Sequence, residues 1–140
     1  MALLLKLNRE AIADNVAIVA AMKSAKLSEA DLGSLVYVWF DDTNQERSGL
    51  ASKAHLAAYE AVYIPQVRDP SKRKHAFRLV LEPLPDPVAR PLATDDLAPF
   101  RYSEDTGGIE SLGRIHRDRN DKIIRLSQGQ ADALAARFDA

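Results

Sequence analysis

Residues able to recognise a flat, polar ligand gather in the stretch YVWFDDTNQERSGLASKAHL, which runs from Tyr37 to Leu56. It contains Trp39, the only tryptophan of the chain, and continues through a polar run to Ser48 and Gly49. A tryptophan ring packs in a core or forms one wall of a pocket for a flat ring. Ser48 offers a donor and an acceptor to the edge of a base, and Gly49 lets the backbone approach a ligand closely. The same pair is typical of an ordinary hairpin turn, so both interpretations stay open.

A second group of residues suited to chemistry is cationic. The segment from residue 114 to residue 125 is net basic, although the whole chain carries 19 Lys+Arg against 20 Asp+Glu. Cations on a hairpin can contact phosphates, which positions a nucleic acid without reading its sequence. The four residues expected to do so are Arg114, Arg117, Arg119 and Lys122. A second basic run, Arg68 to Lys74, lies on a predicted loop, and a solvated charged loop is the alternative for each run.

Metal binding and triad catalysis are not indicated by the histidines. His55, His75 and His116 are too far apart in sequence to share one helical face, and the chain has no cysteine. A Ser/His/Asp triad can be drawn from Ser52, His55 and Asp41, but triads are defined by geometry and such residues occur in nearly every chain. We therefore expect no metal, no cofactor and no catalytic residue.

Length and composition predict a single domain over residues 1–140. Apolar residues make up 46% and charged residues 28%, which is ordinary for a globular protein. The apolar start MALLLKLNRE is too short for a signal peptide or a membrane span, so we expect a cytoplasmic protein without a membrane partner. A net charge of −1 argues against loose electrostatic coating of nucleic acid, but it is compatible with a local basic face.

The predicted elements are a helix near each end and five to six strands between and around them. Strand signals cover residues 2–7, 34–40, 49–64, 75–84, 112–116 and 122–126. Apolar residues at helical spacing predict a helix over residues 9–24, and the capping box from Ser127 to Gln130 predicts another near the C-terminus. Ser28 and Gly33 bracket one short helical turn. The fold class is α+β: a small mixed, mostly antiparallel β-barrel with an N-terminal and a C-terminal helix.

The order of these elements resembles the EVE domain of the PUA-like superfamily over nearly the whole chain. LGSLVYVWF is similar to the EVE strand that follows a glycine, and RSGLAS to the small-Gly-apolar-Ala step into the next strand. ARPLATDDLAPF and the closing stretch SLGRIHRDRNDKIIRLSQGQADALAARF also have EVE counterparts. Ser34 stands where the EVE pattern has an aspartate, and the first strand lacks the usual aromatics.

The resemblance implies a non-enzymatic module that binds DNA or RNA by taking one base, modified or not, into an aromatic pocket. PUA-like domains stack a ring on that base, so the resemblance implies ligand contacts for Trp39, Ser48, Gly49, Leu50 and Tyr102. Trp39 and Phe40 are neighbours in a strand and must face opposite sides. Whether Trp39 faces the pocket or the core therefore decides its role.

Two other functions remain open. The related ASCH proteins imply a small hydrolase or ribonuclease acting on a nucleoside or RNA, for which Lys53 with Glu60 or Glu82 are the candidate residues. The other is a protein-interaction module without a ligand pocket. The sequence does not indicate an oligomeric state.

Overall fold

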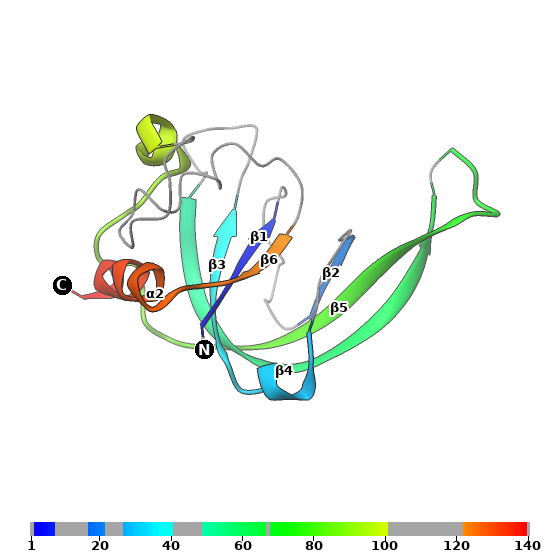
Figure 1. Ribbon diagram of the computed structural model, residues 1–140, viewed down its shortest axis with the longest axis horizontal. Coiled ribbons are helices and arrows are strands. Elements are labelled where there is room, and N and C mark those ends of the chain that lie inside the picture. Colours follow the sequence, from blue (N-terminus) through cyan, green and yellow to red (C-terminus); the bar gives the residue numbers. More distant parts are fainter. Residues whose placement is uncertain are drawn as a thin grey trace.

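The computed structural model describes residues 2–7, 17–21, 27–40, 49–66, 68–100 and 122–139. In these residues the chain forms one mixed six-stranded sheet in the order β2-β5-β4-β3-β1-β6, with a helix after the last strand (Figure 1). The strands are β1 (Leu3–Leu7), β2 (Ala17–Ala21), β3 (Leu35–Phe40), β4 (Gly49–Pro65), β5 (Arg73–Pro83) and β6 (Lys122–Arg125). The helical elements are η1 (Glu29–Asp31), η3 (Thr94–Phe100), α2 (Gln128–Ala135) and η5 (Ala136–Phe138).

Strand β1 lies inside the sheet, parallel to β3 on one side and antiparallel to β6 on the other. All other neighbouring strands are antiparallel. The mixed, mostly antiparallel α+β fold and the C-terminal helix are therefore confirmed. Within the described residues β2 and β6 are the two edges of an open sheet, so the predicted closure into a barrel is not shown.

The predicted N-terminal helix over residues 9–24 is wrong where the structure describes it. Ala17–Ala21 forms strand β2, which pairs with β5 from Ala17 opposite Val80 to Ala21 opposite Ala76. The segment AIVAA contains two β-branched residues, and pairing with the main chain of β5 outweighs the helical preference of its alanines. The rest of the predicted helix falls outside the described residues.

The predicted central strands are confirmed, and β4 is the longest of them. Two register shifts interrupt its pairing, one opposite Val38 and Trp39 in β3 and one between Leu56 and Ala58 opposite β5. Such bulges bend a strand and increase its twist. Figure 1 shows the result, because β4 and β5 curve together around the other strands and extend far beyond them.

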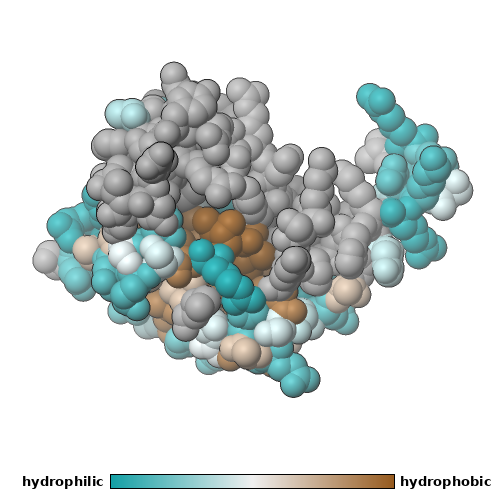
Figure 2. Space-filling view, in the orientation of Figure 1, coloured by the Kyte–Doolittle hydropathy of each residue, from teal (hydrophilic) through white to brown (hydrophobic). Residues whose placement is uncertain are grey.

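Apolar side chains pack on both faces of the sheet. The helix-side cluster, on the face covered by α2 and η3, consists of Leu4, Tyr37, Trp39, Leu50, Leu92, Leu97, Leu126 and Leu134. The opposite cluster consists of Leu3, Leu5, Val36, Val38, Ala54, Leu56, Leu79 and Leu81, with Phe40 against it. In Figure 2 hydrophobic residues surface at the centre of the view, and hydrophilic ones cover the end of the β4–β5 hairpin. Alternation along the strands separates the two clusters.

Polar caps fix the short helices. At the start of α2 the Gln130 N–H donates to Ser127 Oγ at 3.2 Å, and the Ser127 N–H donates to Gln130 Oε1 at 2.9 Å. The predicted capping box is therefore confirmed. At η1 the Ser28 N–H donates to Asp31 Oδ2 at 2.8 Å, which confirms the predicted helical turn.

Asp31 also ties η1 to the distant strand β6. Its buried carboxylate accepts from both terminal nitrogens of Arg125, with 2.8 Å between Arg125 Nη2 and Asp31 Oδ2. Bonding to Arg125 is the largest effect on this carboxyl, and it lowers the pKa of Asp31 from 3.8 to about 2 despite burial. The folded state thus favours the ionised form.

This pair makes stability depend on pH in the acid range. Because the folded pKa of Asp31 lies below the unfolded one, its contribution is complete above about pH 4 and is lost as the pH falls towards 2. We expect Asp31→Asn to lower the free energy of unfolding at pH 7 by at most about 2 kcal/mol, since solvent screens the half-exposed Arg125. The measurement is urea unfolding between pH 2 and 7.

Asp86→Asn provides the matched control, because Asp86 is exposed and lies 3.8 Å from the nitrogen of Lys53. An exposed pair of this kind contributes about 0–1 kcal/mol. Equal pH profiles for the two variants would contradict the role of Asp31.

Candidate functional site

Several residues that the sequence analysis singled out lie at one end of the strands of the sheet, the end at which β1 and β3 finish. β1 and β3 are parallel, so their carboxyl ends meet there, with Lys6 opposite Trp39. Trp39 in turn lies opposite Leu50, and Phe40 opposite Gly49, at the start of β4. On the other side of β1, Lys6 lies opposite Lys122. We call this set the lysine edge; its members are Lys6, Trp39, Gly49, Leu50 and Lys122.

Trp39 is a core residue of the helix-side cluster. Its side chain has 0% exposure, and its indole N–H donates to Thr94 Oγ1 at 2.9 Å. Phe40 packs against the opposite cluster, so the two rings face opposite sides as predicted. A base can stack on Trp39 only if the residues that cover the ring move. The stacking role of Trp39 therefore stays a prediction.

Gly49 holds η3 against the sheet. Its φ of +154° lies in the region that L side chains rarely adopt, and a Cβ there would come within 2.5 Å of the Leu92 carbonyl oxygen. That carbonyl accepts from the Leu50 N–H at 2.9 Å, and Gly49 forms a β-bridge with Ala93. The close approach requires glycine, and it places Thr94 beside Trp39.

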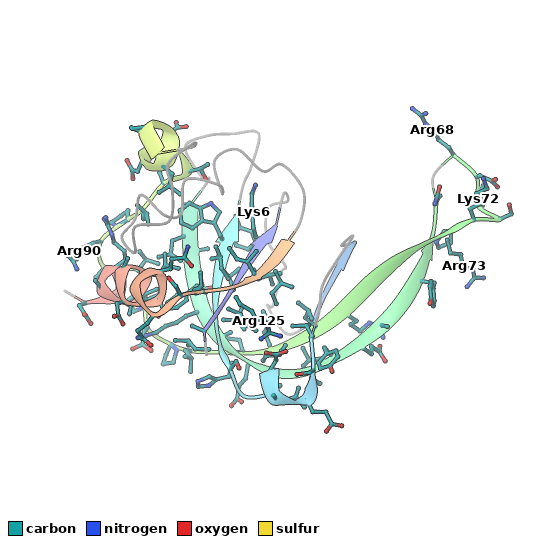
Figure 3. All side chains as sticks on the ribbon, viewed as in Figure 1. Lys6, Arg68, Lys72, Arg73, Arg90 and Arg125 are labelled. Atoms are coloured by element: carbon teal, nitrogen blue, oxygen red, sulfur yellow. The ribbon has the colours of Figure 1, made fainter. Side chains whose placement is uncertain are left out.

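Lys6 is the functional candidate that the sequence reasoning did not select. Only 2% of it is exposed, in a strand whose other described side chains are leucines. Figure 3 shows its side chain projecting past the carboxyl end of β1. Burial of an ammonium group costs several kcal/mol, so lysine is rarely buried in natural proteins unless it is paired. The available signal was one charge within an otherwise apolar strand.

The structure brings together four of the predicted site residues, Trp39, Gly49, Leu50 and Lys122, at the lysine edge. For Lys122 this concerns the backbone position in β6. Ser48, Tyr102, Arg114, Arg117 and Arg119 lie outside the described residues, so their predicted contacts stay predictions.

The residues considered for an ASCH-type hydrolase do not assemble. The nitrogen of Lys53 lies 3.8 Å from Asp86 Oδ2 and 4.7 Å from the centre of the Phe138 ring. The exposed Glu60 accepts from Arg78 at 2.8 Å, so it is engaged elsewhere. Glu82, also exposed, lies opposite His55 and forms no ion pair with Lys53. A proton-transfer pair therefore does not form from these side chains.

The remaining catalytic constellations also lack support in the described part of the chain. Ser52 lies opposite Val38 and His55 opposite Leu35, positions that belong to different faces of the sheet, so these two residues cannot form a triad. Among the described residues, no three His, Cys, Asp or Glu side chains are placed to hold a metal ion.

Comparison with known proteins identifies the fold. No family model matches the sequence, and no curated protein matches it. Among solved structures, a Tyr-to-Phe mutant of ZmASCH from Zymomonas mobilis superposes with a TM-score of 0.58 at 13% identity, covering 96% of both chains. A Ser-to-Ala mutant of the same protein gives 0.56 at 11% identity, covering 96% of this chain and 94% of that one. The DUF55 domain of human thymocyte nuclear protein 1 gives 0.51 at 13% identity, covering 99% of both chains.

The chain thus has the PUA-like fold shared by ASCH and DUF55 (EVE) domains, and the predicted resemblance is confirmed at the level of fold. The match extends over almost the entire length of each neighbour. In the described residues no helix is long and apolar enough to cross a membrane.

Proposed function

We propose that this protein is a nucleic-acid-binding module that holds one nucleotide at the lysine edge. The base, modified or not, would lie beside the start of β4, and its phosphate would lie between the positions of Lys6 and Lys122. The PUA-like fold supports this proposal, since the sequence resemblance to EVE domains implies the same class of ligand.

The placement of Lys6 carries the proposal. Lys6 and Lys122 occupy directly opposite backbone positions on β1 and β6, so two lysine positions are paired across neighbouring strands. In this proposal the phosphate lies at this pair of positions, because phosphate oxygens attract cationic residues. Because Lys6 is buried, a phosphate reaches its ammonium group only when the residues that cover it move, and the low dielectric constant there strengthens the attraction once contact is made.

The other residues of the lysine edge support recognition of a single nucleotide rather than of a long stretch of nucleic acid. Gly49 has no side chain, and its neighbours Leu92 and Ala93 are fixed against it by the bridge and the Leu50 hydrogen bond. A rigid backbone beside a buried cation is suited to hold one small, anionic group in a defined orientation.

The test is a titration with short oligonucleotides of DNA and RNA, single- and double-stranded, with unmodified and modified cytosine or adenine. Trp39 is the only tryptophan and lies opposite Lys6, so its fluorescence reports ligand at this edge. We expect Lys6→Met to weaken binding about 10- to 100-fold, the usual effect of losing one hydrogen bond to a charged group.

Lys53→Met is the matched control, because it removes a lysine that pairs with Asp86 away from the lysine edge. Equal loss of affinity in both variants would contradict the proposal, as would the absence of binding by every oligonucleotide at low salt. Cleavage of the RNA oligonucleotides in place of reversible binding would favour the ASCH-type hydrolase instead.

A further inference from the structure

The outer part of the β4–β5 hairpin is a two-stranded arm. β3 pairs with β4 only as far as His55, and β2 pairs with β5 only as far as Ala76. From Tyr63 opposite His75 to Pro65 opposite Arg73, β4 and β5 have only each other as partners among the described residues. We call residues 63–75 the hairpin tip. Figure 1 shows it at the opposite end of the molecule from α2.

The hairpin tip concentrates positive charge. Its cationic residues are Arg68, Lys72, Arg73 and Lys74, and its only acidic residue is Asp69, in a chain whose net charge is −1. Arg68, Lys72 and Arg73 are exposed, and within the described residues none of them forms an ion pair. Figure 3 shows these three grouped at the far end of the arm, and Lys6 and the tip both extend towards the upper side of that view.

The turn that carries these cations is ordered by its own hydrogen bonds. The Ser71 hydroxyl and N–H both donate to Asp69 Oδ1, at 2.6 and 3.2 Å. The Gln66 N–H donates to the Lys72 carbonyl oxygen at 2.9 Å, and the Lys72 N–H to that of Asp69 at 3.0 Å. A fixed turn presents its charges without the entropy cost of ordering a loose loop on binding.

An aromatic ring accompanies the charges. Tyr63 is 63% exposed, and it shares a face of the arm with the position of Arg73, because Pro65 two residues further lies opposite Arg73. Cations that follow a phosphate backbone together with a ring that accepts a base are the combination used by proteins that bind single-stranded nucleic acid. A single-stranded nucleic acid uses both features, because its phosphates attract the cations and its bases stack on the ring.

We propose that the hairpin tip is a second contact surface of the protein, which binds the phosphates of the nucleic-acid strand that flanks the nucleotide at the lysine edge. This inference rests on the proposed function, since it assigns the rest of the same ligand. Arg68, Lys72 and Arg73 contact phosphates, and Tyr63 stacks on one base. The tip contributes affinity and salt dependence, whereas the lysine edge selects the nucleotide.

The experiment measures the affinity of the unsubstituted protein and of the triple variant Arg68→Gln, Lys72→Gln, Arg73→Gln. The ligands are a trinucleotide and a single strand of about 20 nucleotides, over about 50–200 mM salt. For the long strand, the slope of log affinity against log salt is expected to fall by about 2 and the affinity at low salt to drop at least about tenfold, because each phosphate contact contributes about 0.7 to the slope. Binding of the trinucleotide is expected to stay unchanged.

The control variant Arg78→Gln, Arg90→Gln, Arg137→Gln removes the same charge from residues that already bond to Glu60, Ala136 and Pro91. An equal change of slope in both triple variants would overturn the inference, because it would reflect net charge alone. The inference would also be overturned if the hairpin-tip variant lost affinity for phosphatidylserine vesicles but bound the 20-nucleotide strand as tightly as the unsubstituted protein. If Lys6→Met binds the trinucleotide more weakly but the hairpin-tip variant keeps the salt slope of the unsubstituted protein, the proposed function stands. That result rejects only the role of the hairpin tip.

Discussion

Gly49→Ala is expected to lower the free energy of unfolding by about 2–4 kcal/mol, from backbone strain and overpacking together. The new Cβ would lie 2.5 Å from the Leu92 carbonyl oxygen and 2.9 Å from the Cα of Ala93, and both of these are backbone atoms. Relief requires either η3 or the start of β4 to move away. Urea unfolding measures the loss of stability, and hydrogen exchange at the Leu50 N–H reports whether its bond to Leu92 has opened.

Gly33→Ala is the control for this substitution. Gly33 also has a positive φ, +84°, but apart from Gly33 and its two chain neighbours no described heavy atom lies within 4 Å of the Cβ that alanine would add. Only the conformational cost remains, about 1–2 kcal/mol for an L residue in the left-handed region. If both variants lost the same stability, the contact between Gly49 and Leu92 would not be the cause.

Trp39→Ala is expected to have the largest effect of any single substitution in the helix-side cluster, about 3–5 kcal/mol. The side chain is the largest one that is fully buried, and its removal leaves a cavity between β3, η3 and α2. The same change also leaves the Thr94 hydroxyl without its indole donor. Thermal and urea unfolding give the loss directly.

This expectation changes how binding data on position 39 are interpreted. Loss of nucleic-acid binding in Trp39→Ala would reflect a disrupted core as readily as a lost stacking partner. Trp39→Phe keeps most of the volume and is expected to cost about 1–3 kcal/mol, the usual effect of leaving a buried polar group unsatisfied. Adding Thr94→Val should recover part of that cost, because it removes the hydroxyl that had lost its donor. Additive losses in the double variant would contradict a coupling between the two side chains.

Much of the fold was predictable because local patterns and long-range packing agree. The β-branched and aromatic runs of β3, β4 and β5 form strands, and Ser127 with Gln130 begins α2. The prediction failed at Ala17–Ala21, where spacing fitted a helix and pairing with β5 produced a strand. A short segment of alanine, isoleucine and valine is ambiguous on its own, and the available partner decides its conformation.

The candidate site was less predictable than the fold. The sequence marked Trp39, Gly49 and Lys122, but it did not show that Lys6 lies between two of them. Thr94 is 55 residues from Trp39, and no local pattern indicates their hydrogen bond. Burial of Lys6 likewise follows from strands that are distant in sequence. Such features depend on the register between strands, which composition and periodicity do not specify.

The position of β1 between β3 and β6 has a consequence for how the chain folds. β1 acquires its second neighbour only when β6, which is more than a hundred residues later, pairs with it from Leu3 opposite Arg125 to Lys6 opposite Lys122. Pairing of such distant segments requires a large loss of chain entropy before the hydrogen bonds between the strands stabilise the fold. Folding is therefore slow compared with that of helical proteins of this size. During synthesis the main-chain N–H and C=O groups on one side of β1 therefore stay unpaired until β6 leaves the ribosome, which makes this segment the expected target of chaperones on the nascent chain.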